Sequence, residues 1–329
     1  MEIRKTKIIC TIGPAIDSEQ MLIKMFNAGM NVARLNFSHA TYEESNKRIA
    51  CIRTASAKAN KYIGIMLDTK GPEIRIGTFE GGKCRFEKGD KVELVSDEIV
   101  GNKDRFYVNC PEFFKDISIS NEILIDDGKI SLTVIGKEEG KIICQFNNSG
   151  ELKNKKGINV PGVPLTMPFV SDKDYKDIKF GCMQGVDLIA LSFVRRAEDI
   201  LEVKELLNKF GKPKIEIIAK IENQEGLDNI DEILNVANGV MVARGDLGVE
   251  VQAEMVPFYQ KQIVSKANAL GKPVIIAMLI QTNATINKPS FFLKSLKLCR
   301  SPAMNLNRKP IPKEIKPDHK NGKTEEKSL

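Results

Sequence analysis

Seven short apolar runs alternate along this chain with segments of helical periodicity, and this alternation constrains the fold more than any other feature. Strands buried on both faces are typical of parallel sheets, in which helices form the connections. No GxGxxG follows the first run and no GxxxxGK[ST] occurs, which disfavours a doubly wound nucleotide-binding sheet. We therefore expect an α/β protein with a (β/α)8 TIM-type barrel that is incomplete, with seven strands. The expected strands are residues 7–13, 31–36, 62–67, 186–191, 215–219, 239–243 and 274–277.

The alternation is interrupted after the third expected strand. Residues 72–167 show little helical periodicity and instead carry short alternating pieces, with Asp127-Gly128 as a hairpin turn. We expect an all-β cap domain at 72–167, inserted into a barrel formed by residues 1–71 and 168–280. Residues 281–329 are rich in Lys and Pro and are expected to be a disordered tail.

The net charge of +7 belongs to that tail. Residues 288–329 contain 11 Lys and Arg against 4 Asp and Glu, which leaves 39 of each sign in the rest of the chain. A basic tail can contact a polyanion, but it shows no aromatic interleaving, so a solvated tail and no nucleic-acid partner are expected.

Targeting and redox features indicate a cytoplasmic protein. No stretch approaches the roughly 20 apolar residues of a membrane span, and residues 1–7 lack the layout of a signal peptide. The seven cysteines are scattered without a CxxC pair, as is typical of reduced buried thiols.

Polar residues gather where the expected strands end, which is where barrels carry their sites. Arg34, Asn36 and Ser38 share one face of the second strand, because residues i and i+2 point the same way. A buried arginine requires an anion, either an internal carboxylate or a ligand. The third strand ends in Asp68 and Thr69 within a polar run that continues to Arg75.

Two later strands add carboxylates. The fifth ends with Lys220 and Glu222, and Asp246 lies in a glycine-containing turn after the sixth. Glu222 and Asp246 are the hard oxygen ligands that Mg²⁺ prefers, and Lys220, Arg34 and Arg75 supply positive charge. Fixed cations and Mg²⁺ that neutralise a phosphoryl group are the means of phosphoryl transfer. No Ser–His–Asp set competes, since only His39 and His319 are present.

Five of these segments closely resemble pyruvate kinases in sequence, order and spacing, over residues 3 to about 277. The resemblance implies phosphoryl transfer between phosphoenolpyruvate and ADP in glycolysis, with Mg²⁺ (or Mn²⁺) and K⁺ as cofactors. The segments are 7–14, 29–39, 67–75, 215–223 and 241–250.

The resemblance also implies a role for each matching residue. Glu222 and Asp246 would bind the divalent metal, while Lys220 and Arg34 would act on the phosphoryl group. The backbone amides of Gly245 and Asp246 would hold the substrate carboxylate, and Glu73 resembles the residue of K⁺-dependent members. The K⁺ set would be Asn36, Ser38, Asp68 and Thr69, and the nucleotide-side set Asn36, His39, Arg75 and Lys173. The cap would close over the site and exclude water.

This sequence departs from the family after the seventh strand. The family continues the seventh strand with Ala-Thr-Gln-Met-Leu, whereas here Ala277 is followed at once by Met278 and Leu279. The threonine, which the family associates with protonation of the enolate, is therefore missing. The eighth strand and the C-terminal domain, which carries part of the family's tetramer contact, are not recognisable, so the family's homo-oligomer is not expected. An unclosed barrel would leave the first and seventh strands with unpaired edges and lower the stability.

Three interpretations remain open. The chain is a working pyruvate kinase, a truncated and catalytically impaired relative, or a non-catalytic binding protein that acts through its basic tail. Turnover distinguishes the first two, and loss of polyanion binding on deletion of residues 281–329 would identify the third.

Overall fold

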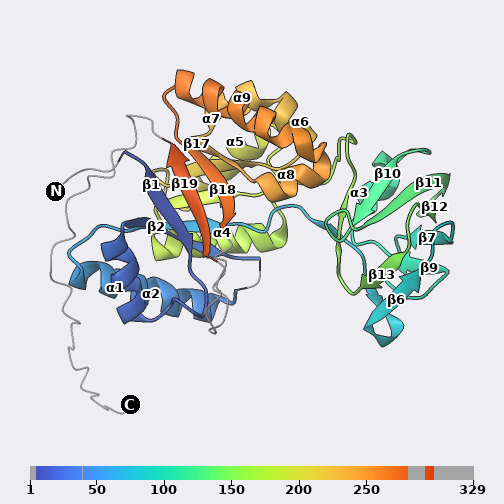
Figure 1. Ribbon diagram of the computed structural model, residues 1–329, viewed down its shortest axis with the longest axis horizontal. Helices are drawn as coiled ribbons and strands as arrows, with labels where there is room; N and C mark the ends of the chain where they lie inside the picture. The colour runs from blue at the N-terminus through green and yellow to red at the C-terminus, as the bar shows by residue number, and fades with distance from the viewer. Residues whose placement is uncertain (1–4, 39, 281–292, 300–329) are drawn as a thin grey trace, which may run out of the picture.

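The computed structural model describes residues 5–38, 40–280 and 293–299, and these form a closed barrel with a separate β-rich cap (Figure 1). Around the barrel the strand order is β1-β19-β18-β17-β16-β15-β3-β2. The seven strands predicted from the sequence are present, and neighbours within this set pair in parallel, which confirms the predicted α/β barrel class. They are β1 (Lys7–Thr11), β2 (Met30–Asn36), β3 (Gly64–Asp68), β15 (Leu188–Leu191), β16 (Glu216–Ile221), β17 (Gly239–Val242) and β18 (Val274–Ile280).

The eighth position of the barrel is filled by a strand that the sequence analysis placed in a disordered tail. β19 (Leu293–Cys299) runs antiparallel to both neighbours, pairing Lys7 with Leu298 on one side and Val274 with Cys299 on the other. The prediction of unpaired edges on the first and seventh strands is therefore wrong. A local Leu-x-x-Leu-x-Leu pattern gave too weak a strand signal among the lysines. The rest of the predicted tail lies outside the described residues.

Helices connect the parallel strands and cover the outside of the barrel (Figure 1). Their ends follow local signals: Ser18 and Thr41 cap α1 and α2 through side-chain oxygens, and Gly29 and Gly185 end α1 and α4 in the left-handed region. The helices are α1 (Glu19–Ala28), α2 (Tyr42–Lys58), α4 (Asp172–Gln184), α5 (Ala197–Lys209), α6 (Gln224–Asp228), α7 (Ile230–Val236), α8 (Arg244–Glu250) and α9 (Val256–Ala269), with a 3-10 turn η2 (Ala253–Met255) before α9.

The inserted segment has its own core and lies to one side of the barrel (Figure 1). Its main sheet has the order β4-β14-β10-β11-β12-β7-β9, and Phe86 stacks on Phe146 in the core with ring centroids 4.3 Å apart. Its elements are β4 (Ile74–Arg75), β5 (Thr78–Phe79), η1 (Glu80–Gly82), β6 (Lys83–Phe86), β7 (Lys91–Val95), β8 (Val100–Gly101), β9 (Arg105–Tyr107), α3 (Pro111–Asp116), β10 (Glu122–Ile125), β11 (Ile130–Glu138), β12 (Lys141–Phe146), β13 (Gly150–Lys153) and β14 (Gly157–Asn159).

The barrel interior fixes where the polar strand ends point. One small cluster of buried residues takes members from all seven parallel strands, which identifies the inward face of each: Ile9, Val32, Met66, Leu188, Ala190, Ile218, Met241 and Ile275. Two residues further along each strand, the same inward face reaches the carboxyl edge of the barrel.

Candidate active site at the carboxyl edge of the barrel

The inward face becomes charged at the carboxyl edge. Arg34, Asp68 and Lys220 follow Val32, Met66 and Ile218 by two residues, so all three point into the barrel mouth, where all are buried. The Arg34 Nε donates to Asp68 Oδ2 at 2.5 Å, and Lys220 Nζ lies 3.2 Å from Asp68 Oδ1. One buried carboxylate thus holds both cations. The sequence analysis required an anion for a buried Arg34, and in the structure that anion is the carboxylate of Asp68.

Glu222 completes this cluster from the loop after β16. Its Oε1 lies 3.0 Å from Lys220 Nζ, and its Oε2 accepts from the Phe193 backbone N–H at 2.7 Å. Glu222 is only 1% exposed. Burial raises its pKa to about 7, helped by the Asp246 carboxylate and opposed by Lys220.

In the two other charged partners, Lys220 and Asp68, the pKa shifts favour the charged form. Burial alone would lower the pKa of Lys220, but Asp68 and Glu222 outweigh burial and raise it, so the ammonium stays charged. Burial likewise works against the charge of Asp68, and Arg34 with Lys220 overcomes it and lowers the pKa of that carboxyl. The cluster therefore holds two fixed positive charges, one fixed negative charge and one carboxyl group poised to change its charge near neutral pH.

The sequence analysis missed Ser192, which lies just past the end of β15 and follows the inward-facing Ala190 by two residues. Its Oγ accepts from Lys220 Nζ at 2.6 Å and donates to the Thr69 carbonyl oxygen at 2.7 Å, while its N–H donates to Thr69 Oγ1 at 3.2 Å. The period-two rule that singled out Arg34 would also have found Ser192, had it been applied to the fourth strand.

Glu222 and Asp246 form the candidate divalent-metal pair. Asp246 is exposed in the first turn of α8, and its charge acts on the pKa of Glu222, so the two carboxylates lie close enough to repel each other. The described residues contain no group of three or more His, Cys, Asp or Glu side chains able to hold a metal. Two carboxylates suffice for Mg²⁺, which keeps water and substrate oxygens as its other ligands. The carboxylates of Glu222 and Asp246 are therefore a suitable pair of protein ligands for a divalent cation such as Mg²⁺.

The predicted K⁺ residues meet at the ends of β2 and β3. Asn36 is paired in register with Asp68, and its Oδ1 accepts from the Ser38 N–H at 3.0 Å. The Phe37 N–H donates to the Asp68 carbonyl at 3.0 Å, which joins the two strand ends. Asn36, Ser38, Asp68 and Thr69 therefore lie at neighbouring strand ends, and their role as a K⁺ site stays a prediction.

Three of the four predicted nucleotide-side residues are described, and Lys173 lies beside the end of β2 that carries Asn36. Arg75 lines the cavity described below and is held by Glu73 Oε2 and the Lys155 carbonyl, both at 2.7 Å. Lys173 instead donates to the Phe37 carbonyl at 2.8 Å and to Asp177 Oδ2 at 2.5 Å. His39 lies outside the described residues.

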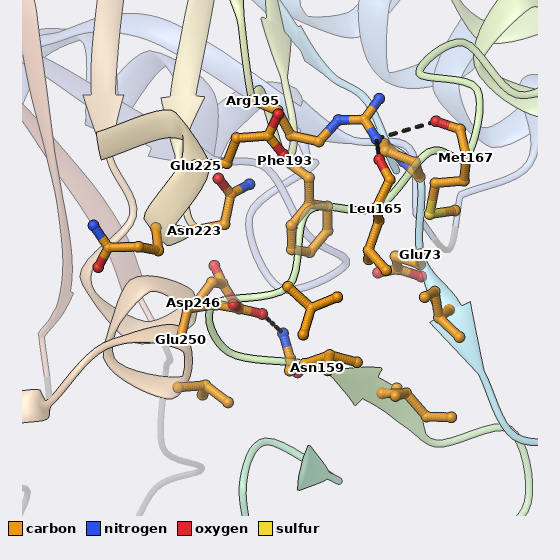
Figure 2. Close-up of a pocket in the computed structure, with 18 of the residues that line it drawn as sticks. Glu73, Asn159, Leu165, Met167, Phe193, Arg195, Asn223, Glu225, Asp246 and Glu250 are labelled. Atoms are coloured by element: carbon orange, nitrogen blue, oxygen red, sulfur yellow. Dashed lines mark hydrogen bonds between the residues drawn. The ribbon is translucent and has the colours of Figure 1, made fainter. Parts of the chain in front are cut away.

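A cavity of about 480 Å³ lies between the barrel mouth and the cap (Figure 2). The barrel contributes Phe193, Asn223 and Asp246, and the cap side contributes Glu73 and Asn159. A space of this size suits a ligand of nucleotide or cofactor size. Gly245, beside Asp246, has open space where a side chain would stand.

Fold and site together define a class: a barrel protein whose carboxyl edge holds a buried cation–carboxylate cluster and faces a cavity closed by a β cap. The sequence matches the family described as "Pyruvate kinase, barrel domain" over residues 3–290. The chain belongs to the pyruvate kinase family.

Individual relatives agree with this assignment. A pyruvate kinase of Bacillus licheniformis is 54% identical over 276 residues, which cover 83% of this chain and 47% of the relative. One of Geobacillus stearothermophilus is 52% identical with the same coverage. A crystal structure of a pyruvate kinase from Cryptosporidium parvum matches with a TM-score of 0.80 at 39% identity, over 84% of this chain and 58% of that one. The chain spans about half the length of the curated relatives it matches.

Within the part of the chain that the structure describes, no helix is both long and apolar enough to cross a membrane.

Proposed function

We propose that this chain transfers the phosphoryl group of phosphoenolpyruvate to ADP, giving pyruvate and ATP. The observation that carries the proposal is the buried cluster in which Arg34 and Lys220 share Asp68, with Glu222 bound to Lys220. The carboxylates hold both cations at the barrel mouth without substrate, so no reorganisation is needed when a phosphoryl group enters.

The bond changes are few. The bond between the enol oxygen and phosphorus breaks, a β-phosphate oxygen of ADP bonds to that phosphorus, and the enolate takes a proton on carbon. Lys220 and Arg34 neutralise the phosphoryl oxygens during transfer, which is the main contribution a protein makes to this reaction. The Gly245 and Asp246 amides hold the carboxylate of phosphoenolpyruvate.

We propose that Glu222 and Asp246 hold Mg²⁺ or Mn²⁺, and that Asn36, Ser38, Asp68 and Thr69 hold K⁺. The divalent ion would supply further positive charge to the phosphoryl oxygens. Glu73 supports a K⁺-dependent site by family resemblance. For the nucleotide we propose Asn36, His39, Arg75 and Lys173, of which Arg75 lines the interdomain cavity.

We propose domain boundaries at residues 72 and 167, because the buried core of the cap runs from Ile74 to Val160 with packed neighbours to Met167. Closure of such a cap excludes water from the transfer step. A cytoplasmic location fits the free cysteines of the described residues, of which Cys10, Cys110, Cys144 and Cys182 are buried.

One departure bears on the last chemical step. Met278 stands directly after Ala277, where the family resemblance implies a threonine, and Met278 is 40% exposed. Methionine has no proton to give, so we propose that the enolate is protonated by solvent in this chain and that turnover is slower for it.

The test is ATP formation from phosphoenolpyruvate and ADP with Mg²⁺, with and without K⁺, beside Lys220→Met. We expect slow turnover that depends on K⁺ and disappears in the variant. Soluble, folded wild-type protein without turnover would refute the proposal. K⁺-independent turnover would refute the monovalent site alone.

A further inference from the structure

Helix α8 presents two carboxylates to the interdomain cavity. Asp246 lies in its first turn and Glu250 is its last residue, and both line the cavity. A separation of four residues places them on the same face of the helix. Figure 2 shows both on the barrel side, with Asn159 of the cap opposite.

Glu250 is joined directly to the cap. Asn159 Nδ2 donates to Glu250 Oε1 at 2.7 Å, a contact between residues 91 positions apart in the chain (Figure 2). Burial raises the pKa of Glu250, and the bond from Asn159 opposes that rise. The carboxylate is thus partly removed from water beneath the cap, with an amide as its partner. A hydrogen bond to a charged group in such surroundings is stronger than one between neutral groups.

A second contact touches the same turn of α8. Gly128, at the tip of the β10–β11 hairpin, comes so close that a Cβ placed on it would lie 3.7 Å from Val249 Cγ1. The cap therefore meets the end of α8 through two separate pieces, the hairpin tip and β14.

Helix α8 is short, so a displacement of Glu250 at its end would also move Asp246 in its first turn. It has seven residues, and backbone bonds from Leu247 to Ala243 and from Val251 to Leu247 join its two ends. Leu247 is fully buried, so α8 is anchored on the barrel near its middle. Movement of Glu250 with the cap would tilt α8 about this anchor and displace Asp246.

We propose that Asn159 and Glu250 form an interdomain latch, which holds the cap against α8 and thereby positions the Asp246 carboxylate. Glu250 is a positioning residue in this scheme and contacts no reacting atom. The latch itself depends only on the contacts above, whereas its effect at Asp246 rests on the proposed function.

The latch is tested by hydrogen exchange on the full chain without ligands. Glu250→Ala removes the acceptor and Asn159→Asp sets two carboxylates against each other. In both we expect about tenfold faster exchange in residues 157–160 and 244–251, the effect of losing one bond of this kind. The double variant Asn159→Asp with Glu250→Gln reverses the direction of the bond and should restore wild-type exchange.

Two controls separate the latch from general destabilisation. Glu254→Ala removes an exposed carboxylate just beyond α8 and should change nothing. Exchange in β16 reports whether each variant is folded. Unchanged exchange in Glu250→Ala, or failure of the double variant to restore protection, would overturn the latch.

The effect on Asp246 is tested by direct binding of Mn²⁺ to the resting protein, followed by electron paramagnetic resonance. We expect Glu250→Ala to bind Mn²⁺ about tenfold more weakly, and Glu254→Ala to bind as wild type does. If Glu250→Ala binds Mn²⁺ as tightly as the wild type, the coupling to Asp246 is overturned. The latch itself is then decided by the hydrogen-exchange experiment alone. Wild-type protein that binds no Mn²⁺ would overturn both the coupling and the proposed metal pair.

Discussion

Replacing Lys220 with methionine should destabilise the metal-free protein by an amount that grows with pH. Lys220 is 8% exposed and contacts Asp68, Glu222 and Ser192. Asp68 retains Arg34 in the variant, but Glu222 loses its cation and is left buried beside Asp246. Removal of one partner from a buried ion pair typically costs about 3–5 kcal/mol.

The pH dependence comes from Glu222, whose pKa in the wild type is about 7. The unfolded chain has the ordinary, lower value, so the contribution of Glu222 to wild-type stability is complete below that value and is lost as pH rises through about 7. Lys220 lowers the pKa of Glu222. In the variant this lowering is absent, so folded Glu222 keeps its proton to a higher pH than in the wild type. Above pH 7 the difference in stability should widen by about 1.4 kcal/mol per pH unit, or about 2 kcal/mol between pH 7 and 8.5.

The assay is urea unfolding of both proteins with a chelator at pH 6, 7 and 8.5. At pH 6 Glu222 is largely protonated in both, so we expect a loss of only about 1–3 kcal/mol, from the contacts with Asp68 and Ser192. The matched background is Glu222→Gln, in which Lys220→Met should cost the same at every pH. A pH-independent loss in the original background would refute the charge state assigned to Glu222.

Three further outcomes are expected. Binding of Mg²⁺ to Glu222 and Asp246 should weaken by up to about tenfold for each pH unit below 7, since Glu222 must lose its proton; calorimetric titrations at pH 6 and 8 check this, and equal affinities would exclude Glu222 as a ligand. Ser192→Ala should lower kcat by about tenfold, because Lys220 and the Thr69 carbonyl lose the hydroxyl between them; an unchanged kcat in a stable variant would deny it that role. Insertion of Thr-Gln between Ala277 and Met278 adds a hydroxyl and preserves the two-residue alternation of β18, so turnover should rise at least about tenfold; no increase would show that the missing threonine does not limit the reaction.

The seven parallel strands could be predicted because each is a mainly apolar run followed by a helical pattern, and the cap because its alternation has period two. β19 could not, since its strand character depends on the edges of β1 and β18 that it pairs with, and β1 lies at the other end of the described chain. Propensity alone does not carry such pairing information.

For the candidate site, the direction of the side chains could be predicted from the sequence, but their partners could not. The inward direction of Arg34, Asp68 and Lys220 follows from alternation along each strand. Their pairing does not follow, because it depends on how strands from different parts of the chain are ordered around the barrel. The partners of Lys173 show the limit most clearly: it lies in the first turn of α4, and its ammonium binds Asp177 and the Phe37 carbonyl, contacts that no local pattern predicts.

Under the proposed function, the charge arrangement lets one cluster serve the protein both before and after its ligands bind. Without a ligand, Asp68 holds Arg34 and Lys220, and a Glu222 carboxyl that titrates near neutrality limits the buried negative charge. A divalent cation at Glu222 and Asp246 would favour the ionised form of Glu222 and relieve the repulsion between these carboxylates. The added positive charge would then be available for the phosphoryl oxygens of a substrate in the cavity. Asp68 and the titrating Glu222 thus offset part of the charge of the two cations, and under the proposed function metal together with substrate would shift that balance towards phosphoryl transfer.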